Sequence, residues 1–259
     1  IHDTITAKPL RYRIRCNFKI SDGEIGFYKY GSREFVKIDD CPVISEHIVN
    51  YAKNFNYPPD VKEISFTENS NGEIVSGLDK KVTFYETKHG KIPLSGDSFF
   101  QGNRFLIPRL LDIALEFTNG SKRILELYCG SGFFTSVLWK DTEFILAMDF
   151  DKNAINMAKK MGYPHSVFKV QDLDKPFNIK GSFDTVLLDP SRNGLSKNVI
   201  NVVGGLKPER IVYISCNPTT MARDVKTFYK DYEITRFYMV DMFPNTYHIE
   251  SAALLSKRY

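Results

Sequence analysis

Two patterns of apolar and polar positions divide the chain. The first part alternates in the manner of β-strands, in RYRIRCNFKI, EIGFYKYGS and EFVKI, with a turn at Asp22-Gly23. Residues 44–54 have the spacing of a short helix, and residues 61–95 return to strand-like runs separated by Asn-Gly and His-Gly. The pattern predicts a small β-rich domain over residues 1–95.

The pattern after residue 95 is a regular alternation of strands and helices. Apolar runs such as RILELY, EFILAMDF, FDTVLLDP and RIVYISCN are separated by segments of helical periodicity. This order is typical of an α/β domain with a parallel sheet covered on both faces, here over residues 96–259. The last two runs, EITRFYMVDMF and SAALLSKRY, leave no room for a crossover helix. The final strand is therefore expected to run antiparallel.

The composition is compatible with an RNA partner and gives no indication of a membrane one. Lys and Arg number 35 against 31 Asp and Glu, a net charge of +4, which permits RNA but does not require it. The basic excess gathers at Lys8, Arg11, Arg13 and Arg15, as expected for an RNA-facing strand or, equally, for a solvated one. No apolar run approaches the roughly 18 residues that suggest a membrane span. We expect a cytoplasmic monomer with reduced thiols and no membrane partner.

Candidate cofactor residues lie where the strands of the second domain end. Gly130 and Gly132 form a loop after the first of these strands and open a helix. Further carboxylates end the next three strands, namely Asp149, Asp172 and Asp189. Acids at this edge suit the ribose and the charged sulfonium of S-adenosylmethionine better than a nicotinamide dinucleotide, whose glycine fingerprint would need Gly where Thr135 stands. A turn without function also explains a single Gly-x-Gly.

Candidate catalytic residues lie at the same edge. Cys216 ends the fifth strand before Asn-Pro, Asp189 precedes Pro190, and Glu250 comes just before the last strand. Each has a plainer interpretation: a buried small apolar side chain for the cysteine, a helix cap for the aspartate, and an ordinary surface group for the glutamate.

Five motifs occur in order: SFFQGN, ELYCGSGFFT, LLDPSR, RIVYISCNPTTMARD and DMFPNTYHIES. Together they resemble the TrmA/RumA family of RNA uridine-5-methyltransferases, from about residue 11 to residue 259. The resemblance implies a class I (Rossmann-like) S-adenosylmethionine methyltransferase sheet and a product of 5-methyluridine in RNA. It implies Cys216 as nucleophile and Glu250 as general base. The implied cofactor-binding set is Gln101, Tyr128, Asp149, Asp172 and Asp189, to which the loop adds Gly130 and Gly132.

The chemistry explains why these residue types are needed. Carbon 5 of uracil is a weak nucleophile, and thiolate addition at carbon 6 turns the ring into an enolate that can accept a methyl group. A base must then remove the hydrogen at carbon 5 so that the thiolate can leave. The target base must also be flipped out of its stack.

Departures from the family pattern concern the cofactor loop and a metal cluster. Phe133 stands where the family usually has Asn, and DPSR replaces the commoner DPPR or DPAR. Cys41 resembles the fourth iron–sulfur ligand of longer relatives, whose other three ligands and small RNA-binding barrel would lie upstream of Ile1. We therefore expect no metal site in this chain, and a cluster only in a longer form.

The RNA target stays open at this point. The last two motifs are more similar to the 23S rRNA branch than to the tRNA T-loop branch, so rRNA is the expected partner and tRNA the alternative. Rival interpretations are a cytosine-5 methyltransferase, which would usually carry Pro-Cys, a nicotinamide oxidoreductase, and a non-catalytic RNA-binding module.

Overall fold

The computed structural model describes residues 4–79 and 81–258. They pack into two compact units: a smaller one from Lys8 to Ile107, and a larger one that joins the segment ending at Ala7 to the chain from Pro108 onward. The predicted boundary at residue 95 differs from this division. Whether residues 1–95 and 96–259 fold as separate domains stays a prediction.

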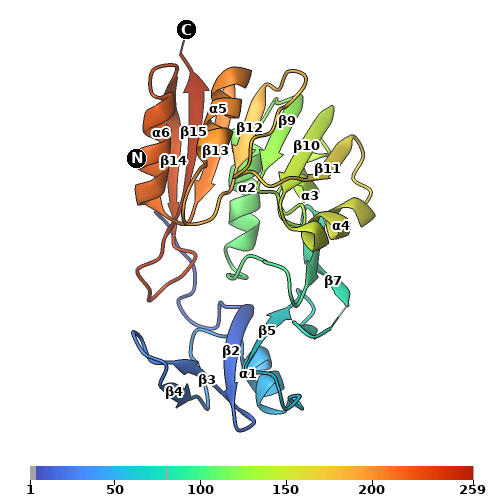
Figure 1. Cartoon of the computed structure of the whole chain (residues 1–259), viewed down its shortest axis with the longest axis vertical. Helices are drawn as coiled ribbons and strands as arrows, with labels where there is room; N and C mark the ends of the chain where they lie inside the picture. The colour runs from blue at the N-terminus through green and yellow to red at the C-terminus, as the bar shows by residue number, and fades with distance from the viewer. Residues whose placement is uncertain (1–3, 80, 259) are drawn as a thin grey trace. The chain divides into compact units, whose positions relative to one another are not determined.

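The larger unit is built on one open, mostly parallel sheet (Figure 1). Its strands, in spatial order, are β1 (Thr4–Ile5), β14 (Tyr232–Val240), β15 (Glu250–Lys257), β13 (Arg210–Ser215), β12 (Thr185–Leu188), β9 (Arg123–Leu127), β10 (Phe144–Asp149) and β11 (Ser166–Val170). Neighbours pair in parallel, except that β15 runs antiparallel to both β13 and β14. The predicted α/β fold with an antiparallel last strand is confirmed.

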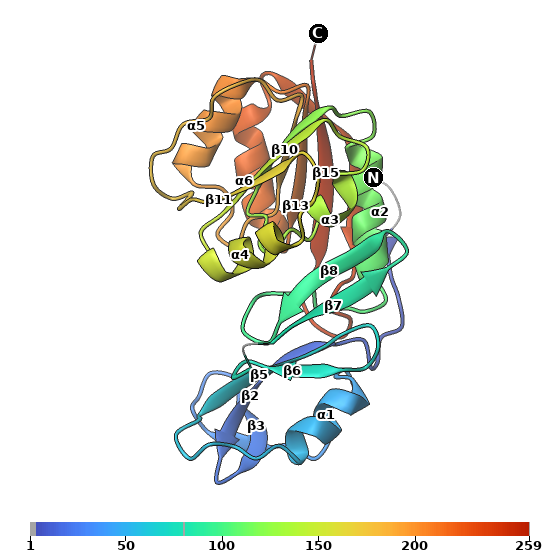
Figure 2. The ribbon, with the colours of Figure 1, turned by 90° about the vertical axis from the view of Figure 1, so that its right-hand side faces the viewer.

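Helices cover both faces of this sheet. They are α2 (Ile107–Phe117), α3 (Thr135–Leu138), α4 (Lys152–Lys160), α5 (Lys197–Leu206) and α6 (Pro218–Phe228). In Figure 2, α5 and α6 lie on one side of the sheet and α2 and α3 on the other. Strands β12 and β13 are almost wholly buried, which explains why TVLL and RIVYIS read as continuous apolar runs rather than alternating ones.

The smaller unit is an antiparallel sheet with one helix, as its alternating pattern predicts. The sheet order is β4 (Phe35–Lys37), β3 (Glu24–Tyr28), β2 (Arg15–Ser21), β5 (Glu63–Glu68) and β6 (Ile74–Ser76), beside a separate hairpin of β7 (Val82–Thr87) and β8 (Gly90–Ser95). Helix α1 (Glu46–Lys53) packs Ile48 and Val49 into a core with Phe18 and Phe66. Asp22 and Gly23 both have positive φ, which matches the twist that a tight β2–β3 turn needs.

Three element bounds differ from the sequence-based expectation. Strand β1 was not expected, because a strand of two residues shows no periodicity in the sequence. It is recognised as a strand only through its parallel pairing with β14. Helix α3 is a single turn. Helix α6 begins directly at Pro218, within the Ser-Cys-Asn-Pro motif, because Asn217 caps it and proline suits the first helical position.

Candidate active site

The strand ends of the larger unit bring the predicted site residues to one edge of the sheet. The register sets Leu127 opposite both Met148 and Leu188, and Leu188 opposite Tyr213. The residues that end or directly follow these strands therefore share one edge, namely Tyr128, Asp149, Asp189 and Cys216. Open α/β sheets bind ligands at this carboxyl edge of their strands.

The antiparallel strand β15 carries Glu250 to the same edge. Ser251 pairs with Ser215, and the Ser251 hydroxyl donates to the Ser215 carbonyl at 3.2 Å. Cys216 and Glu250 are the residues next to this pair, and the charge of Glu250 acts on the Cys216 thiol. A thiol and a carboxyl from strands distant in sequence thus meet at one edge of the sheet.

The electrostatics around Cys216 favour the protonated thiol in the free protein. The side chain is half-buried, and loss of solvent raises its pKa, with the charges of Glu250 and Asp189 adding to the effect. Arg192 is the cation that opposes them. A cysteine in these surroundings is therefore less readily ionised than a free one.

The two carboxyls near Cys216 are also hard to ionise. Glu250 is buried, and burial with the charge of Asp189 raises its pKa to about 8, against the opposing charge of Arg192. Asp189 is partly accessible, yet it lies deep enough among protein atoms that burial and the charge of Asp149 raise its pKa to about 7. A carboxyl with a pKa close to neutral pH is suited to proton transfer.

Arg192 is a site residue that the sequence analysis did not select. Its guanidinium lies 3.0 Å from Nε2 of His248, and its backbone carbonyl accepts from the Asn217 side-chain amide at 3.1 Å and the Thr220 hydroxyl at 3.2 Å. The start of α6 thus holds the loop after β12. In the sequence, the one indication of this role is that Arg192 directly follows Asp-Pro-Ser at the end of a predicted strand.

The glycine loop closes on Asp149. Gly130 N–H donates to Asp149 Oδ2 and Asp151 N–H donates to Asp149 Oδ1, both at 2.9 Å. Gly130 has a φ of 53°, and an added Cβ there would meet no atom within 4 Å, so the loop presents bare backbone on that side. Gly132 instead faces Phe168, which a Cβ would approach to 3.3 Å.

The other predicted cofactor residues have different surroundings. Tyr128 adopts a φ of 65°, uncommon for a residue with a side chain, and burial raises its pKa to about 12. Asp172 follows β11 and is held by Lys175 Nζ at 3.0 Å, and this ion pair lowers its pKa. Gln101 is buried in the smaller unit. The assignments of all these residues to a cofactor stay predictions.

Glu126 is a second residue that the sequence analysis missed. It lies fully buried in the middle of β9, where the Thr135 hydroxyl donates to its Oε2. Its Oε1 is buried without a hydrogen-bond partner among the described residues. Burial raises its pKa to about 8, and the charges of Asp189 and Asp149 act in the same direction. An acid inside an otherwise apolar strand was the signal for it.

The described residues contain no group of three or more His, Cys, Asp or Glu side chains arranged to hold a metal ion. Cys41 is a half-buried free thiol in the smaller unit. Over the same part of the chain, every helix is too short or too polar to cross a bilayer.

Comparisons with known proteins give one consistent result. The family model described as tRNA (uracil-5-)-methyltransferase matches residues 80–171 and 165–258. An uncharacterized RNA methyltransferase of Aquifex aeolicus is 32% identical over 96% of this chain and 71% of its own length. The 23S rRNA (uracil(1939)-C(5))-methyltransferase RlmD of Vibrio parahaemolyticus is 27% identical over 90% of this chain and 65% of its own length.

A solved structure is similar over almost the whole chain. It is the Pyrococcus abyssi tRNA (uracil-54, C5)-methyltransferase in complex with S-adenosyl-L-homocysteine. It superposes with a TM-score of 0.82 at 25% identity, covering 98% of this chain and 78% of that one. The likeness thus includes both compact units.

Proposed function

The chain belongs to the tRNA (uracil-5-)-methyltransferase family, and from this premise we propose that it transfers a methyl group from S-adenosylmethionine to carbon 5 of a uridine in RNA. The observation that carries the proposal is the register of β13 and β15, which pairs Ser215 with Ser251, the residues next to Cys216 and Glu250, together with the effect of the Glu250 charge on the Cys216 thiol. This reaction needs a nucleophile and a base acting on adjacent carbons of one ring.

In the proposed mechanism, Cys216 adds to carbon 6 of the uracil. The thiol gives its proton to solvent as the S–C bond forms, and the electron pair of the 5,6 double bond moves toward carbon 5 and the oxygen on carbon 4, which makes an enolate. Arg192, whose charge favours the ionised forms of both Cys216 and Glu250, stabilises the negative charge that appears here.

Glu250 completes the proposed reaction. After carbon 5 has gained the methyl group, the Glu250 carboxylate accepts the remaining hydrogen from carbon 5 as a proton. The electron pair of that C–H bond restores the double bond, and the thiolate leaves carbon 6. The raised pKa of Glu250, about 8, suits a group that must take up a proton near neutral pH.

The cofactor edge fits a cationic ligand. Burial raises the pKa of Glu126 and of Asp189, and the charge of Asp149 raises both further, so that a cationic sulfonium at this edge would favour the ionised carboxylates. S-adenosylmethionine supplies an electrophilic methyl group when bound. Gly130 with its open backbone and Asp149 at the end of β10 would hold it, together with Tyr128 and Asp172; a pyrophosphate-containing dinucleotide would be repelled by the same acids.

We propose 23S rRNA as the substrate, with the tRNA T-loop as the alternative. A 23S rRNA enzyme and a tRNA enzyme are similar to the chain at 27% and 25% identity, so identity alone does not decide between them. The decisive experiment is mass-spectrometric mapping of 5-methyluridine in rRNA and tRNA from cells with and without the gene. Loss of one methylated uridine in 23S rRNA supports the proposal, and loss confined to tRNA supports the alternative.

A non-catalytic RNA-binding module is the remaining alternative. Complementation of the deletion strain with Cys216→Ala separates the two functions, because a binding module does not need the thiol. If Cys216→Ala restores 5-methyluridine in the RNA, or the growth of the deletion strain, as well as the wild type does, the enzymatic proposal is wrong.

A further inference from the structure

The basic residues near the N-terminus of the smaller unit do not share one environment. Arg11 is neutralised by protein carboxylates, with Nη2 2.7 Å from Asp40 and Nε 3.3 Å from Glu46. Arg15 instead donates to two neutral acceptors, the Ser98 carbonyl at 3.2 Å and the Asn17 amide oxygen at 3.3 Å. The positive charge of Arg15 is therefore held without an acidic neighbour in contact among the described residues.

Arg13 and Arg15 line one cavity of about 380 Å³ in this unit. Residues two apart on an extended chain point to the same face, which sets the two guanidinium groups together. Asn17, Phe27 and Cys41 also line the cavity, and none of its lining residues within the described chain is acidic. The cavity therefore combines two fixed positive charges with an apolar wall.

The two charges act on each other. Loss of solvent lowers the pKa of Arg15 most, and the charge of Arg13 lowers it further, while the opposing effect of Asp97 is smaller. A bound anion would favour the charged forms of both side chains. A guanidinium presents a planar fork of donors that matches the oxygens of a phosphate.

We propose that Arg13 and Arg15 bind a backbone phosphate of the RNA in this cavity. The proposal rests on the proposed function, because it is the RNA substrate that brings a phosphodiester to this unit. Phosphate contacts of this kind fix the position of the RNA without reading its sequence. Phe27 in the cavity wall offers a ring face to the attached nucleoside.

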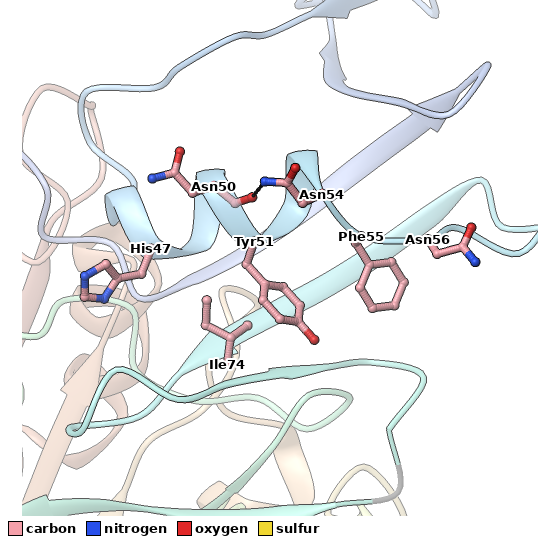
Figure 3. A pocket seen from close by; sticks show the side chains of 7 residues that line it. All are labelled: His47, Asn50, Tyr51, Asn54, Phe55, Asn56 and Ile74. Carbon is pink, nitrogen blue, oxygen red and sulfur yellow. Dashed lines mark hydrogen bonds between the residues drawn. The ribbon is translucent and has the colours of Figure 1, made fainter.

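A larger hollow in the same unit differs from this cavity in having no positively charged lining residue among the described ones. It has a volume of about 510 Å³ and is lined by α1, by Ile74 of β6 and by the chain after α1. In Figure 3, Tyr51 lies between α1 and Ile74, and the polar groups around the hollow are the asparagine amides, the Tyr51 hydroxyl and the His47 imidazole. It is lined by no lysine or arginine among the described residues, so it lacks the charge that would hold a phosphate.

The test measures binding of a fluorescein-labelled oligouridylate across a series of KCl concentrations. Arg13→Gln/Arg15→Gln should weaken binding about 10- to 100-fold, the range for a hydrogen-bonded charged contact. It should also reduce the slope of log K against log salt by about 0.7, the value for one phosphate on a single strand. Arg33→Gln is the matched control, because it removes the same charge from an exposed turn of the same unit and should leave both quantities close to the wild type.

Cys41 gives a second readout that does not depend on a variant folding well. Because its thiol lines the same cavity, oligouridylate should slow its alkylation by iodoacetamide in the wild-type protein, measured by peptide mass spectrometry. Arg13→Lys/Arg15→Lys keeps the charge and should keep most of the salt slope. An unchanged salt slope in the Gln variant, or an unchanged alkylation rate of Cys41 under saturating oligouridylate, overturns the proposal.

Methyl transfer to total RNA from the deletion strain separates this proposal from the proposed function. If the wild type methylates RNA but the Gln variant keeps the wild-type salt slope, only the cavity assignment fails. If the wild type binds oligouridylate through the cavity yet methylates no RNA, only the proposed function fails.

Discussion

At the scale of single residues, Cys216 and Glu250 act at different points of the proposed reaction, so their variants should fail differently. Cys216→Ala should bind RNA and cofactor but form no covalent complex. In Glu250→Gln, Cys216 should still form the bond to carbon 6 and carbon 5 of the uracil should still gain the methyl group. The reaction should then stall, because elimination needs the base. Denaturing electrophoresis should reveal an accumulating protein–RNA adduct for Glu250→Gln and none for Cys216→Ala.

Two outcomes contradict these roles. Turnover of Glu250→Gln near the wild-type rate would exclude it as the base. An adduct formed by Cys216→Ala would mean that another group attacks carbon 6. RNA containing 5-fluorouridine serves as the control, because it should trap the wild-type protein in the same adduct when fluorine blocks removal of the carbon 5 substituent.

Glu126 allows a test of the buried acids through pH-dependent stability. Its pKa is raised to about 8 in the folded protein, so the folded state binds more protons than the unfolded one above the ordinary glutamate pKa. The stability that this implies is fully present at low pH and is lost as pH rises through about 8. Glu126→Gln, which resembles the protonated form, should therefore unfold at a higher temperature than the wild type at pH 9 but not at pH 4.

The fluorescence of the single tryptophan, Trp139, reports this transition, because Trp139 lies in the same unit just after α3. The difference in melting temperature between wild type and Glu126→Gln should grow with pH. A difference that is constant from pH 4 to pH 9 would show that Glu126 ionises in the folded state as readily as in the unfolded one.

At the scale of elements, the start of α6 depends on its cap. The Asn217 side chain accepts hydrogen bonds from Thr219 N–H at 3.1 Å and Thr220 N–H at 3.5 Å. Asn217→Ala should lower the free energy of unfolding by about 1 kcal/mol, in urea titrations followed by Trp139 fluorescence. Asn217→Asp keeps the capping oxygen and loses the amide that donates to the Arg192 carbonyl, so it should lose less stability than Asn217→Ala; equal losses in both variants would place the contribution of Asn217 in the bond to Arg192 rather than in the cap.

At the scale of the whole molecule, the cysteines are too scattered to form a cluster. Cys16 is buried, and loss of solvent raises its pKa to about 12, while Cys41 is half-buried and Cys129 and Cys216 belong to the other unit. One or two thiols cannot hold an iron–sulfur cluster, which takes four ligands. We therefore expect iron and sulfide assays on the anaerobically purified chain to find neither in stoichiometric amount, and stoichiometric iron would refute this.

The sequence by itself determined the order of strands and helices and the residues of the larger unit that meet at one sheet edge. Alternation and helical spacing are local properties, and carboxyl ends of parallel strands share an edge whatever the loops do. The antiparallel direction of β15 followed likewise, from the short connection that precedes it.

Only the tertiary structure decided which of those residues become neighbours. The register of β15 against β13 pairs Ser251 with Ser215 and so brings Glu250 and Cys216 to the same edge, and pairing across strands leaves no trace in the local spacing of either segment. Tertiary structure likewise decides other contacts of the chain. It leaves Glu126 Oε1 without a hydrogen-bond partner among the described residues, and it places Arg192 against His248. It also gives Arg11 and Arg15 different environments. Each depends on groups distant in sequence that meet only when the chain is folded.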